Sequence, residues 1–559
     1  MKRNVLNIAA IVIALFGVGF GIGCLISLLS SKGSLADGEY RVTVCSTTDI
    51  HGAYFDSAYV DNLAAKTSLA NVSSYLKEIR GEGVQPVLID VGDNLQGDNA
   101  AYYFNYVATE VPHVYPRIAA YLGYDAIVVG NHDIETGHDV YDRVASELTM
   151  PYLAANAAFD RDENGRADMD ENPDGKTVSD SYFVPYCIVD RGGVKVAIVG
   201  MTNGNIKSWL ADDIWRGMDF QIISEMVQPV IDRMIEKEKP QLVVLAVHSG
   251  TGAEQPNREN EAQYLAATLR GVDIVLNGHD HRPVAREVEN VNGGSVVLID
   301  AGTKAVVVGQ ADFTLTVKNG KVVSKSVDYK LVPMEKYPVD PDYVAAFKED
   351  FNAVKAFAQR PIGQLSENIF LADALDGPST YINLVQTVQL ASSGADISFA
   401  APLTNSGVVP KGVIEFQDLV SIYKFENQLY VVEMTGKQIK DYLEYSYKNW
   451  VNKSGPSYNW DSADGIRYEV SRKAPDGERV KILSMNDGTP FDLDKTYKVA
   501  MTSYRASGGG DLVREGAGID PASLVVVRKM KDIRSLIGDY IAAEKEIVPT
   551  VATNWKFVK

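Results

Sequence analysis

Cysteine is scarce in this chain, with only three residues among 559. Cys24 lies in an N-terminal apolar segment, and Cys45 and Cys187 lie in strand-like runs. The sequence contains no Cys-x-x-Cys pair, which excludes a zinc site built from cysteines. Cys45 and Cys187 could form a disulfide or remain as two buried thiols, and we expect the thiols.

Positive charge is also in deficit. Lys and Arg number 54 against 73 Asp and Glu, so the net charge is −19. An acidic surface repels nucleic-acid polymers and gains nothing from counterion release, so we expect no nucleic-acid polymer as a partner. A small anionic substrate remains compatible with this charge if metal ions supply a local positive field.

Long hydrophobic runs are absent except for one, from Val5 to Leu29, which follows Lys2 and Arg3. The run is long enough to span a bilayer, and it also has the charged and apolar regions of a secretory signal. A cleaved signal and a retained anchor both place the rest of the chain outside the cytoplasm. We therefore predict an extracytoplasmic protein in which residues 1–36 alone contact a membrane.

Beyond residue 37, short apolar runs alternate with segments of helical periodicity, which predicts an α/β layered domain. Five runs end in polar tips, and the C-terminal strand ends of such sheets are where sites form. The tips are Asp49-Ile50-His51, Asp93-Asn94, Gly130-Asn131-His132-Asp133, His248, and His279-Asp280-His281. We therefore expect residues far apart in the sequence to share one site, with Asp133 and Asp280 as supporting or capping groups.

Histidine is infrequent, and five of the seven histidines lie at these strand tips. Carboxylate, imidazole and amide oxygen ligands suit divalent cations of the Mn, Zn, Fe or Co class rather than calcium. A shared carboxylate can bridge two such ions, as in binuclear phosphoesterases. The sequence thus predicts two divalent metal ions held by Asp49, His51, Asp93, Asn131, His248, His279 and His281.

Taken in order, these motifs resemble those of the metallophosphoesterase superfamily, and most closely the 5′-nucleotidase and 2′,3′-cyclic-nucleotide phosphodiesterase family. The resemblance implies an α/β fold in three parts. A metallophosphoesterase α/β/β/α sandwich would span residues 37–335, a helical linker 336–360, and a C-terminal α/β 5′-nucleotidase-type substrate-binding domain 361–559.

The resemblance also implies individual roles. One metal would be held by Asp49, His51, Asp93 and His281, and the other by Asp93, Asn131, His248 and His279, with Asp93 bridging. His132 would bind no metal and would stabilise the transferred phosphate or protonate the leaving oxygen. The 5′-nucleotidases of the family carry an Asp three residues after this histidine, where the present chain has Glu135. We predict a catalytic His132–Glu135 dyad.

In the C-terminal part, Phe425 and Tyr504 could be ordinary packing residues or could stack a base. Ser507, Gly508 and Gly509 follow the second aromatic, and glycines allow a ligand to approach the backbone closely. The family clamps a nucleoside base between two aromatic residues at matching positions. The resemblance therefore implies a substrate site formed by these five residues.

Two departures indicate the branch of the family. Residues 401–405 read Ala-Pro-Leu-Thr-Asn, where the 5′-nucleotidase branch has an Arg-containing segment, and Gly510 stands where that branch has Asp. Five other segments look like the cyclic-phosphodiesterase/3′-nucleotidase branch: 47–51, 206–209, 382–386, 423–427 and 504–510. We predict hydrolysis of 2′,3′-cyclic nucleotides and 3′-nucleotides to nucleoside and phosphate. The alternatives are a 5′-nucleotidase or nucleotide-sugar hydrolase on the same scaffold, and a non-catalytic surface binding protein.

Two further segments carry predictions. Residues 160–171 match the twelve-residue EF-hand loop at positions 1, 3, 5, 6, 9 and 12, but lack convincing flanking helices. This segment is either a structural calcium site or a solvated acidic loop. Asp340 before Pro341 predicts the start of a linker helix that ends before Pro361 and serves as a hinge or as a packed core helix.

Overall fold

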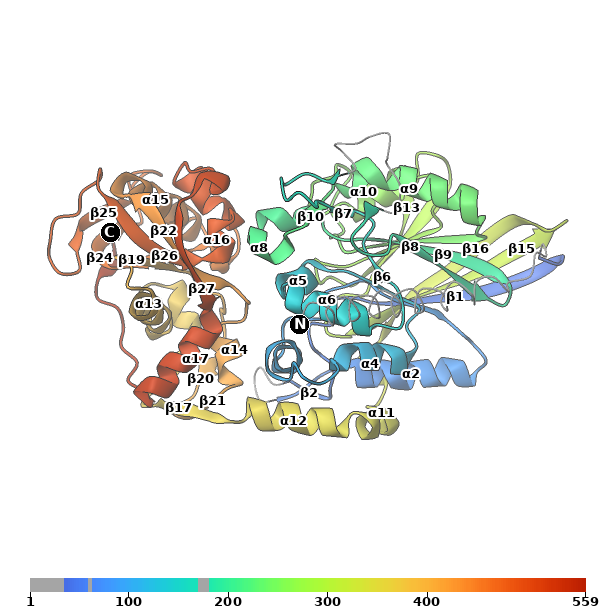
Figure 1. The fold of residues 1–559 in the computed structure, drawn as a ribbon, viewed down its shortest axis with the longest axis horizontal. Coiled ribbons are helices and arrows are strands. Elements are labelled where there is room, and N and C mark those ends of the chain that lie inside the picture. The colour runs from blue at the N-terminus through green and yellow to red at the C-terminus, as the bar shows by residue number, and fades with distance from the viewer. Residues whose placement is uncertain (1–34, 59–62, 169–179) are drawn as a thin grey trace, which may run out of the picture.

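The computed structural model describes residues 35–58, 63–168 and 180–559. The chain folds as a sandwich of two sheets between helices, a helical linker and a C-terminal α/β domain (Figure 1). The fold class predicted from the sequence is therefore confirmed.

The first sheet of the sandwich has six strands in the order β16-β15-β1-β4-β5-β6. Strands β1, β4, β5 and β6 are parallel, and β15 pairs antiparallel with β1 and with β16. The β15–β16 hairpin turns at Asn319-Gly320 with φ of 52° and 68°, the geometry that an Asn-Gly turn favours. The strands are β16 (Lys321–Pro333), β15 (Val307–Lys318), β1 (Gly38–Thr47), β4 (Val87–Asp90), β5 (Ala126–Val128) and β6 (Tyr152–Leu153).

The second sheet has the order β13-β14-β12-β11-β9-β8. Its four inner strands are parallel, and its two edge strands are antiparallel to their neighbours. The strands are β13 (Val284–Glu289), β14 (Ser295–Asp300), β12 (Ile274–Asn277), β11 (Leu242–Val247), β9 (Val194–Met201) and β8 (Tyr186–Arg191).

One apolar core fills the space between the sheets, where Val44 and Ile89 of the first sheet share a buried cluster with Val244 and Leu276 of the second. Each such side chain contributes about 1.5–3 kcal/mol on burial. Helices cover the outer faces: α2 (Leu69–Gly81), α4 (Val114–Leu122) and α6 (His138–Glu147) on the first sheet, and α9 (Ile223–Glu238) and α10 (Ala262–Thr268) on the second.

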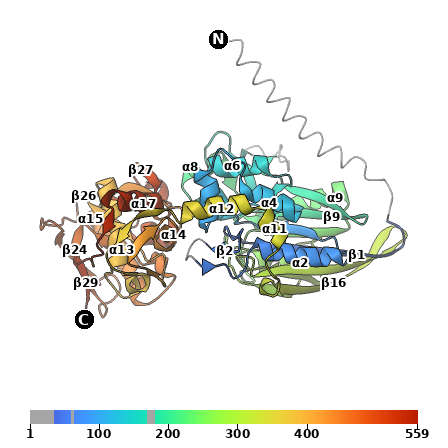
Figure 2. The same cartoon turned by 90° about the horizontal axis from the view of Figure 1, so that it is seen from below.

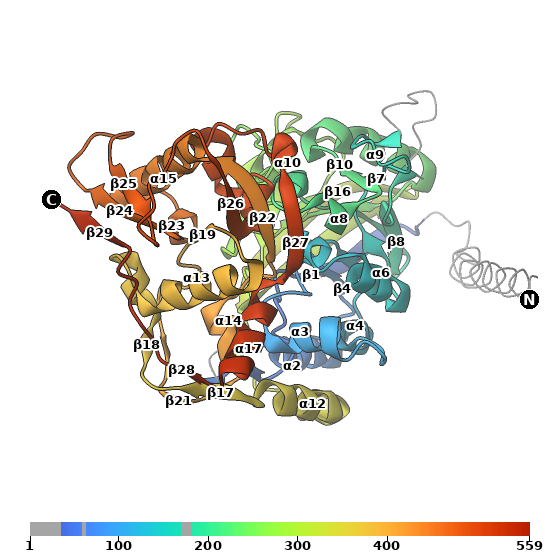
Figure 3. The same cartoon turned by 60° about the vertical axis from the view of Figure 1, so that its left-hand side comes forward.

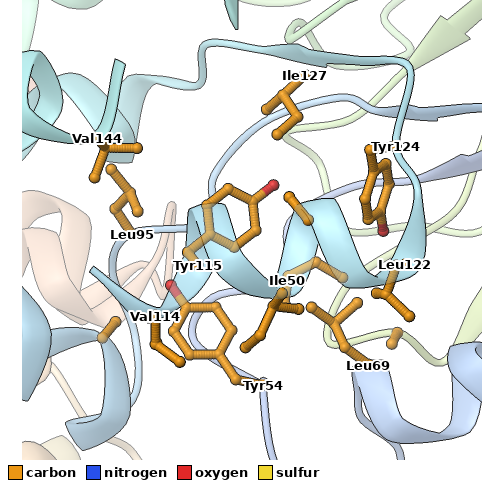
Figure 4. Packing of buried hydrophobic residues seen from close by; sticks show 14 of the residues in the cluster. Ile50, Tyr54, Leu69, Leu95, Val114, Tyr115, Leu122, Tyr124, Ile127 and Val144 are labelled. Atoms are coloured by element: carbon orange, nitrogen blue, oxygen red, sulfur yellow. The ribbon is translucent and has the colours of Figure 1, made fainter. Parts of the chain in front are cut away.

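The apolar core between the first sheet and its covering helices extends to the loops that carry the predicted metal ligands. Ile50 lies between two predicted ligands, and Leu95 follows the tip that carries Asp93, yet both side chains are fully buried. They pack in one cluster with Leu69 of α2 and Tyr115 of α4 (Figure 4). Each loop is therefore anchored in the core by an apolar residue next to its polar ones.

The C-terminal domain is built on a five-stranded sheet in the order β23-β19-β26-β22-β27. Residues of β22 enter two different cores, so that Val432 packs with α15 and Leu429 packs with α13 and α17. Helices thus cover both faces of this sheet. The elements are β23 (Ser462–Asp464), β19 (Ile397–Ala400), β26 (Thr496–Thr502), β22 (Gln428–Thr435), β27 (Val526–Asp532), α13 (Thr380–Ser393), α15 (Gly436–Val451) and α17 (Ile533–Glu544).

Shorter elements complete the fold. In the first domain these are β2 (Ser57–Ala58), β3 (Leu63–Ala64), α3 (Asn99–Tyr102), α5 (Asn131–Glu135), β7 (Ala157–Phe159), α8 (Asp212–Trp215) and β10 (Met218–Phe220). In the C-terminal domain they are β17 (Pro361–Leu365), β18 (Ile369–Phe370), β20 (Val408–Val409), β21 (Gly412–Glu415), α14 (Asp418–Ile422), β24 (Ile466–Ser471), β25 (Val480–Met485), α16 (Ser503–Ala506), β28 (Glu546–Ile547) and β29 (Trp555–Val558).

The linker is two helices, α11 (Pro341–Ala346) and α12 (Lys348–Ala358), and the prediction of one continuous helix is wrong. The break is at Phe347, whose φ and ψ are −111° and 19°. Its ring is buried in the first domain's core, which turns the chain there. Farther along α12, the ring centroid of Phe357 lies 4.4 Å from that of Phe416 in the C-terminal domain and 5.2 Å from that of Tyr103 in the first domain. Helix α12 is therefore packed against both domains (Figure 2).

The two domains also touch directly (Figure 3). Lys529 of β27 pairs with Asp212 of α8 at 3.0 Å. Gln96, in the loop after β4, donates through Nε2 to the carbonyl of Lys424 in the C-terminal domain at 3.1 Å. The loop that carries the predicted bridging ligand is therefore in contact with the loop that carries Phe425.

Cys45 and Cys187 are both free thiols, as expected, but only Cys45 is buried and Cys187 is half-buried. The apolar segment from Val5 to Leu29 lies outside the described residues. Across 35–58, 63–168 and 180–559, none of the helices has the length and apolarity needed to cross a membrane.

Asp340 connects the linker to the first domain through several hydrogen bonds, so its loss should lower the stability of the protein. Its side chain caps α11 through the backbone N–H of Asp342 at 3.0 Å, and it accepts from Ser73 Oγ at 2.5 Å and Lys77 Nζ at 2.7 Å. Asp340→Ala should lower the free energy of unfolding by about 1–3 kcal/mol, since a cap and buried hydrogen bonds are lost. Chemical denaturation of the full chain measures this loss.

Asp342→Ala is the matched control, because the side chain of Asp342 is 80% exposed and pairs with the same Lys77. Surface pairs contribute about 0–1 kcal/mol. Equal losses in the two variants would contradict the role assigned to Asp340.

Candidate active site

All seven predicted metal ligands lie together where the loops after β1, β4, β5, β11 and β12 converge. The ligand atoms of Asp49, His51 and His281 lie within 4.8 Å of one another, and those of Asp93, His248 and His279 form a second such group. Asn131 joins the second group, because its Oδ1 lies 3.1 Å from His248 Nε2 and 2.9 Å from His279 Nδ1.

The donor atoms are placed as cation ligands would be. His51 Nε2 and His281 Nε2 face each other at 3.0 Å, a contact that requires a proton or a cation to be shared between them. Asp49 Oδ1 and Asp93 Oδ2 are buried, and each faces a predicted histidine ligand, His281 Nε2 at 3.3 Å and His248 Nε2 at 3.0 Å. Buried carboxylates that converge with imidazole nitrogens form a donor set that fits two divalent cations.

Two of the predicted histidine ligands differ in their protonation. Burial lowers the pKa of His51 to about 4, which leaves it neutral at pH 7, the form that a metal ligand requires. Burial would also lower the pKa of His248, but the carboxylate of Asp93, 3.0 Å away, raises it to about 10. A cation that binds His248 therefore displaces a proton.

The backbone at the ligands is in the left-handed region. This holds for Asp49 (φ 50°), His51 (48°), Asp93 (60°), His279 (86°) and His281 (59°). For residues with side chains this conformation costs roughly 1–3 kcal/mol each and gathers at functional sites. The sequence gives no direct signal of this strain.

Cross-loop hydrogen bonds hold the strained loops in place. Asp49 N donates to Gly92 O at 2.8 Å, and His51 N donates to Asp93 O at 2.9 Å. The loops approach so closely that only glycine fits at some positions. A Cβ on Gly130 would lie 2.1 Å from Asp93 Oδ1.

Asp133 organises these loops without facing the ligand groups. Its carboxylate accepts from the backbone N–H groups of Gly130, Asp93, Asn94 and Leu95 at 2.8, 3.1, 2.8 and 3.0 Å. The supporting role predicted for Asp133 is confirmed. Its position three residues after Gly130 gives α5 a capping carboxylate and fixes the loop after β4 at the same time.

His132 and Glu135 are in contact, with Nδ1 2.5 Å from Oε2. The His132 ring is part-buried and lies 5.4 Å from that of His51. Burial would lower the pKa of His132, but the carboxylates of Asp93 and Glu135 raise it to about 9. The predicted pair is thus arranged to keep His132 protonated at neutral pH.

A cavity of about 540 Å³ lies between the two domains and joins the metal groups to the C-terminal domain. On one side it is lined by Asn131, His132, Glu135 and His279. On the other side it is lined by all five residues predicted to bind substrate: Phe425, Tyr504, Ser507, Gly508 and Gly509.

The loop after β26 owes its shape to contacts that the sequence did not reveal. A Cβ on Gly509 would lie 2.3 Å from the Tyr504 ring, so glycine is required there. Arg505 is buried, bonds to both carboxylate oxygens of Asp461 at 3.0 and 2.9 Å, and reaches Asn459 Oδ1 at 3.0 Å. This guanidinium holds two cavity-lining loops in a fixed relation.

The cavity is also lined by residues that were not predicted to belong to the site, among them Trp209, Glu259, Tyr458 and Arg514. Tyr458 meets the Phe425 ring edge-on at 6.1 Å. None of these residues belongs to a strand-tip motif, and the family likeness of segment 206–209 is the one signal in the sequence that pointed to Trp209.

The acidic segment after β7 is partly described. The carboxylates of Asp160, Asp162 and Asp168 lie within 4.8 Å of one another, whereas Glu171 lies outside the described residues. Asp160 accepts from the backbone N–H groups of Asn164 and Gly165 at 3.0 and 2.8 Å. Asp168 is paired with Arg161, a contact that a bound cation would have to replace.

Comparison with known proteins identifies both domains. Residues 41–283 match the family model of the calcineurin-like phosphoesterases, and residues 361–514 match that of the 5′-nucleotidase C-terminal domain. A Salmonella typhimurium protein named 2′,3′-cyclic-nucleotide 2′-phosphodiesterase/3′-nucleotidase is 26% identical over 96% of this chain and 92% of its own length. Escherichia coli protein UshA is 25% identical over 86% and 88%.

Solved structures agree in fold. A Staphylococcus aureus protein solved with α-ketoglutarate matches with a TM-score of 0.75 and 21% identity over 93% of this chain and 100% of that one. A 5′-nucleotidase precursor from Thermus thermophilus matches with a TM-score of 0.64 and 21% identity over 93% and 99%. The resemblance that the motifs predicted is confirmed, and the calcineurin-like fold implies divalent metal ions.

Proposed function

We propose that this chain, a metal-dependent phosphoester hydrolase with a calcineurin-like phosphoesterase domain and a 5′-nucleotidase C-terminal domain, hydrolyses 2′,3′-cyclic nucleotides and 3′-nucleotides to nucleoside and phosphate. One observation carries the proposal. A single cavity holds the predicted ligands His279 and Asn131 at one end and the aromatic residues Phe425 and Tyr504 at the other. A phosphate and a base of one molecule could occupy the two ends together.

Asp49, His51, Asp93 and His281 would hold one cation, and Asp93, Asn131, His248 and His279 the other. When bound, the two cations supply positive charge for the phosphoryl oxygens and acidify a water molecule. Manganese, zinc, iron and cobalt suit this mixture of nitrogen and oxygen donors.

His132 would act on the alcohol side of the scissile bond. Its Nδ1 is committed to Glu135, which leaves Nε2–H of the protonated ring for the leaving oxygen. A cyclic phosphate would open to the 3′-nucleotide, and a second cycle at the same centre would release phosphate. The C-terminal domain selects the nucleoside. Its base would stack between Phe425 and Tyr504, and the nucleoside would lie close to the backbone of Gly508 and Gly509.

We further propose that the protein works outside the cytoplasm. The basic residues and apolar run before residue 37 support this location, as a cleaved signal or as an anchor.

The substrate preference is the primary test. The full chain loaded with Mn²⁺ should release phosphate from 2′,3′-cyclic AMP and 3′-AMP with kcat/KM at least about tenfold above that for 5′-AMP, a difference of about 1.4 kcal/mol in transition-state binding. A preference for 5′-AMP would favour the 5′-nucleotidase alternative. Two bound metal ions without hydrolysis of any of the three would favour a binding protein.

Glu135→Gln tests the dyad. Removing the carboxylate charge lowers the pKa of His132, which is about 9 with Glu135 in place. Because the protonated imidazole is the proposed acid, activity is lost as pH rises through that pKa. The alkaline limb of the pH–kcat profile should therefore move to lower pH by roughly 1 unit or more. We expect kcat to fall about tenfold or more, with KM little changed.

Glu135→Asp keeps the charge and serves as the control, so its alkaline limb should stay close to that of the unaltered protein. An unchanged profile and turnover in Glu135→Gln would remove Glu135 from the mechanism.

For the acidic segment we propose a structural calcium ion, supported by the grouping of Asp160, Asp162 and Asp168. Calorimetry should detect calcium binding in the full chain and its loss in the Asp160→Ala/Glu171→Ala variant. Asp232→Ala/Glu236→Ala removes the same charge from the exposed face of α9 and should leave the isotherm unchanged. An identical isotherm in the first variant would identify the segment as a solvated loop.

A further inference from the structure

His279 differs from the other predicted histidine ligands in how its ring is held. His51 and His248 present Nε2 to their groups and direct Nδ1 to backbone carbonyls, of Gln96 at 2.9 Å and Val91 at 2.7 Å. His279 is reversed. Its Nδ1 lies 2.9 Å from Asn131 Oδ1 in the metal group, and its Nε2 lies 3.2 Å from Glu259 Oε1.

The face of the same ring is also covered. The Trp209 ring stacks on the His279 imidazole at 5.4 Å between centroids and 19° between planes. Trp209 and Glu259 both line the cavity and come from different loops of the first domain. Glu259 thus meets the ring at its outer nitrogen, and Trp209 meets it at its face.

Both supporting loops are tied together by one buried side chain. Asn203, which is fully buried, donates through Nδ2 to the carbonyl of Glu259 at 3.1 Å. Its Oδ1 accepts from the N–H of Asn205 at 2.9 Å, at the start of the turn that leads to Trp209. Ser249 Oγ, next to the predicted ligand His248, donates to the same carbonyl at 2.8 Å.

The turn that carries Trp209 has its own anchors. Lys207 Nζ lies 2.7 Å from Asp219 Oδ1 and 2.8 Å from the carbonyl of Gly165. Trp215 Nε1 donates to the carbonyl of Leu210 at 3.1 Å. The position of Trp209 is therefore fixed by the first domain itself rather than by a bound substrate.

We propose that Glu259 and Trp209 are positioning residues for the metal ligand His279. Glu259 accepts the Nε2 proton and so fixes the tautomer in which the Nδ1 lone pair faces the group of Asp93, His248 and Asn131. Trp209 fixes the plane of the ring. Outer partners of this kind raise the basicity of an imidazole ligand, and their loss typically costs about 10–100-fold in metal affinity.

The proposal rests on the ligand role proposed for His279, and it concerns one of the two metal ions. In Glu259→Ala, the affinity for one cation should fall about 10–100-fold and that for the other should stay unchanged. His51, a predicted ligand of the other ion, directs its outer nitrogen to the carbonyl of Gln96 instead. Trp209→Ala should weaken the binding of the same cation, and Trp209→Phe, which keeps a stacking ring, should largely restore it.

The experiment is a titration of the full chain, stripped of metal by chelation, with Mn²⁺ followed by calorimetry and electron paramagnetic resonance. Visible absorption of the Co²⁺-loaded chain reports the ligand field of the affected site. Glu254→Ala is the control, because Glu254 is exposed in the same loop and lines no part of the cavity. Thermal unfolding of the metal-free variants verifies that each is folded.

Glu259→Gln keeps an acceptor without the charge, and it decides the question if Glu259→Ala does not fold. We expect a smaller loss, of roughly a few-fold, and an altered Co²⁺ spectrum. Two unchanged affinities and an unchanged spectrum in the folded Glu259 variants would overturn the proposal. An unaltered protein that binds two metal ions but cleaves no nucleotide would instead contradict the proposed function and leave this test valid.

Discussion

The loop after β4 must hold a carboxylate at the centre of the site on a left-handed backbone, and the surrounding structure depends on this requirement. Asp93 has φ 60°, and its amide is held by Asp133 at 3.1 Å. Its Oδ1 accepts from the N–H of His132 at 2.7 Å, while its Oδ2 faces His248. Gly130 is required beside it, because any Cβ would collide with this carboxylate. The strain is offset by hydrogen bonds from α5 and by apolar anchors in the core such as Leu95.

The sequence predicted the parts of the site that follow from local pattern. A buried run such as Ala126–Val128 ends in polar residues that no core would accept, and parallel strands bring such ends to one edge. The spacing of His132 and Glu135 places them on one face of a short helix, so their contact could also be expected. The helix start at Asp340-Pro341 is equally local, and these predictions agree with the structure.

What could not be predicted depends on contacts between segments distant in sequence. The break at Phe347 arises because its ring packs against Tyr343 and against Tyr121 of the first domain, a demand that helical periodicity does not record. Segment 206–209 carries a likeness to the family, but nothing in the sequence indicates that Trp209 and Glu259 meet at His279. Their relation to His279 depends on contacts such as those of Asn203, which joins the two loops.

A buried ion pair on the C-terminal side of the cavity has a related role. Arg505 and Asp461 are almost fully buried, and the cost of desolvating them offsets much of their attraction. An apolar pair would stabilise the domain about as well, but it could not hold Asn459 and Gly509 at once through directed hydrogen bonds. The pair therefore contributes geometry more than stability. It fixes Tyr504 opposite the metal groups, as Asp133 fixes Asp93, so that both ends of the cavity are positioned before any ligand binds.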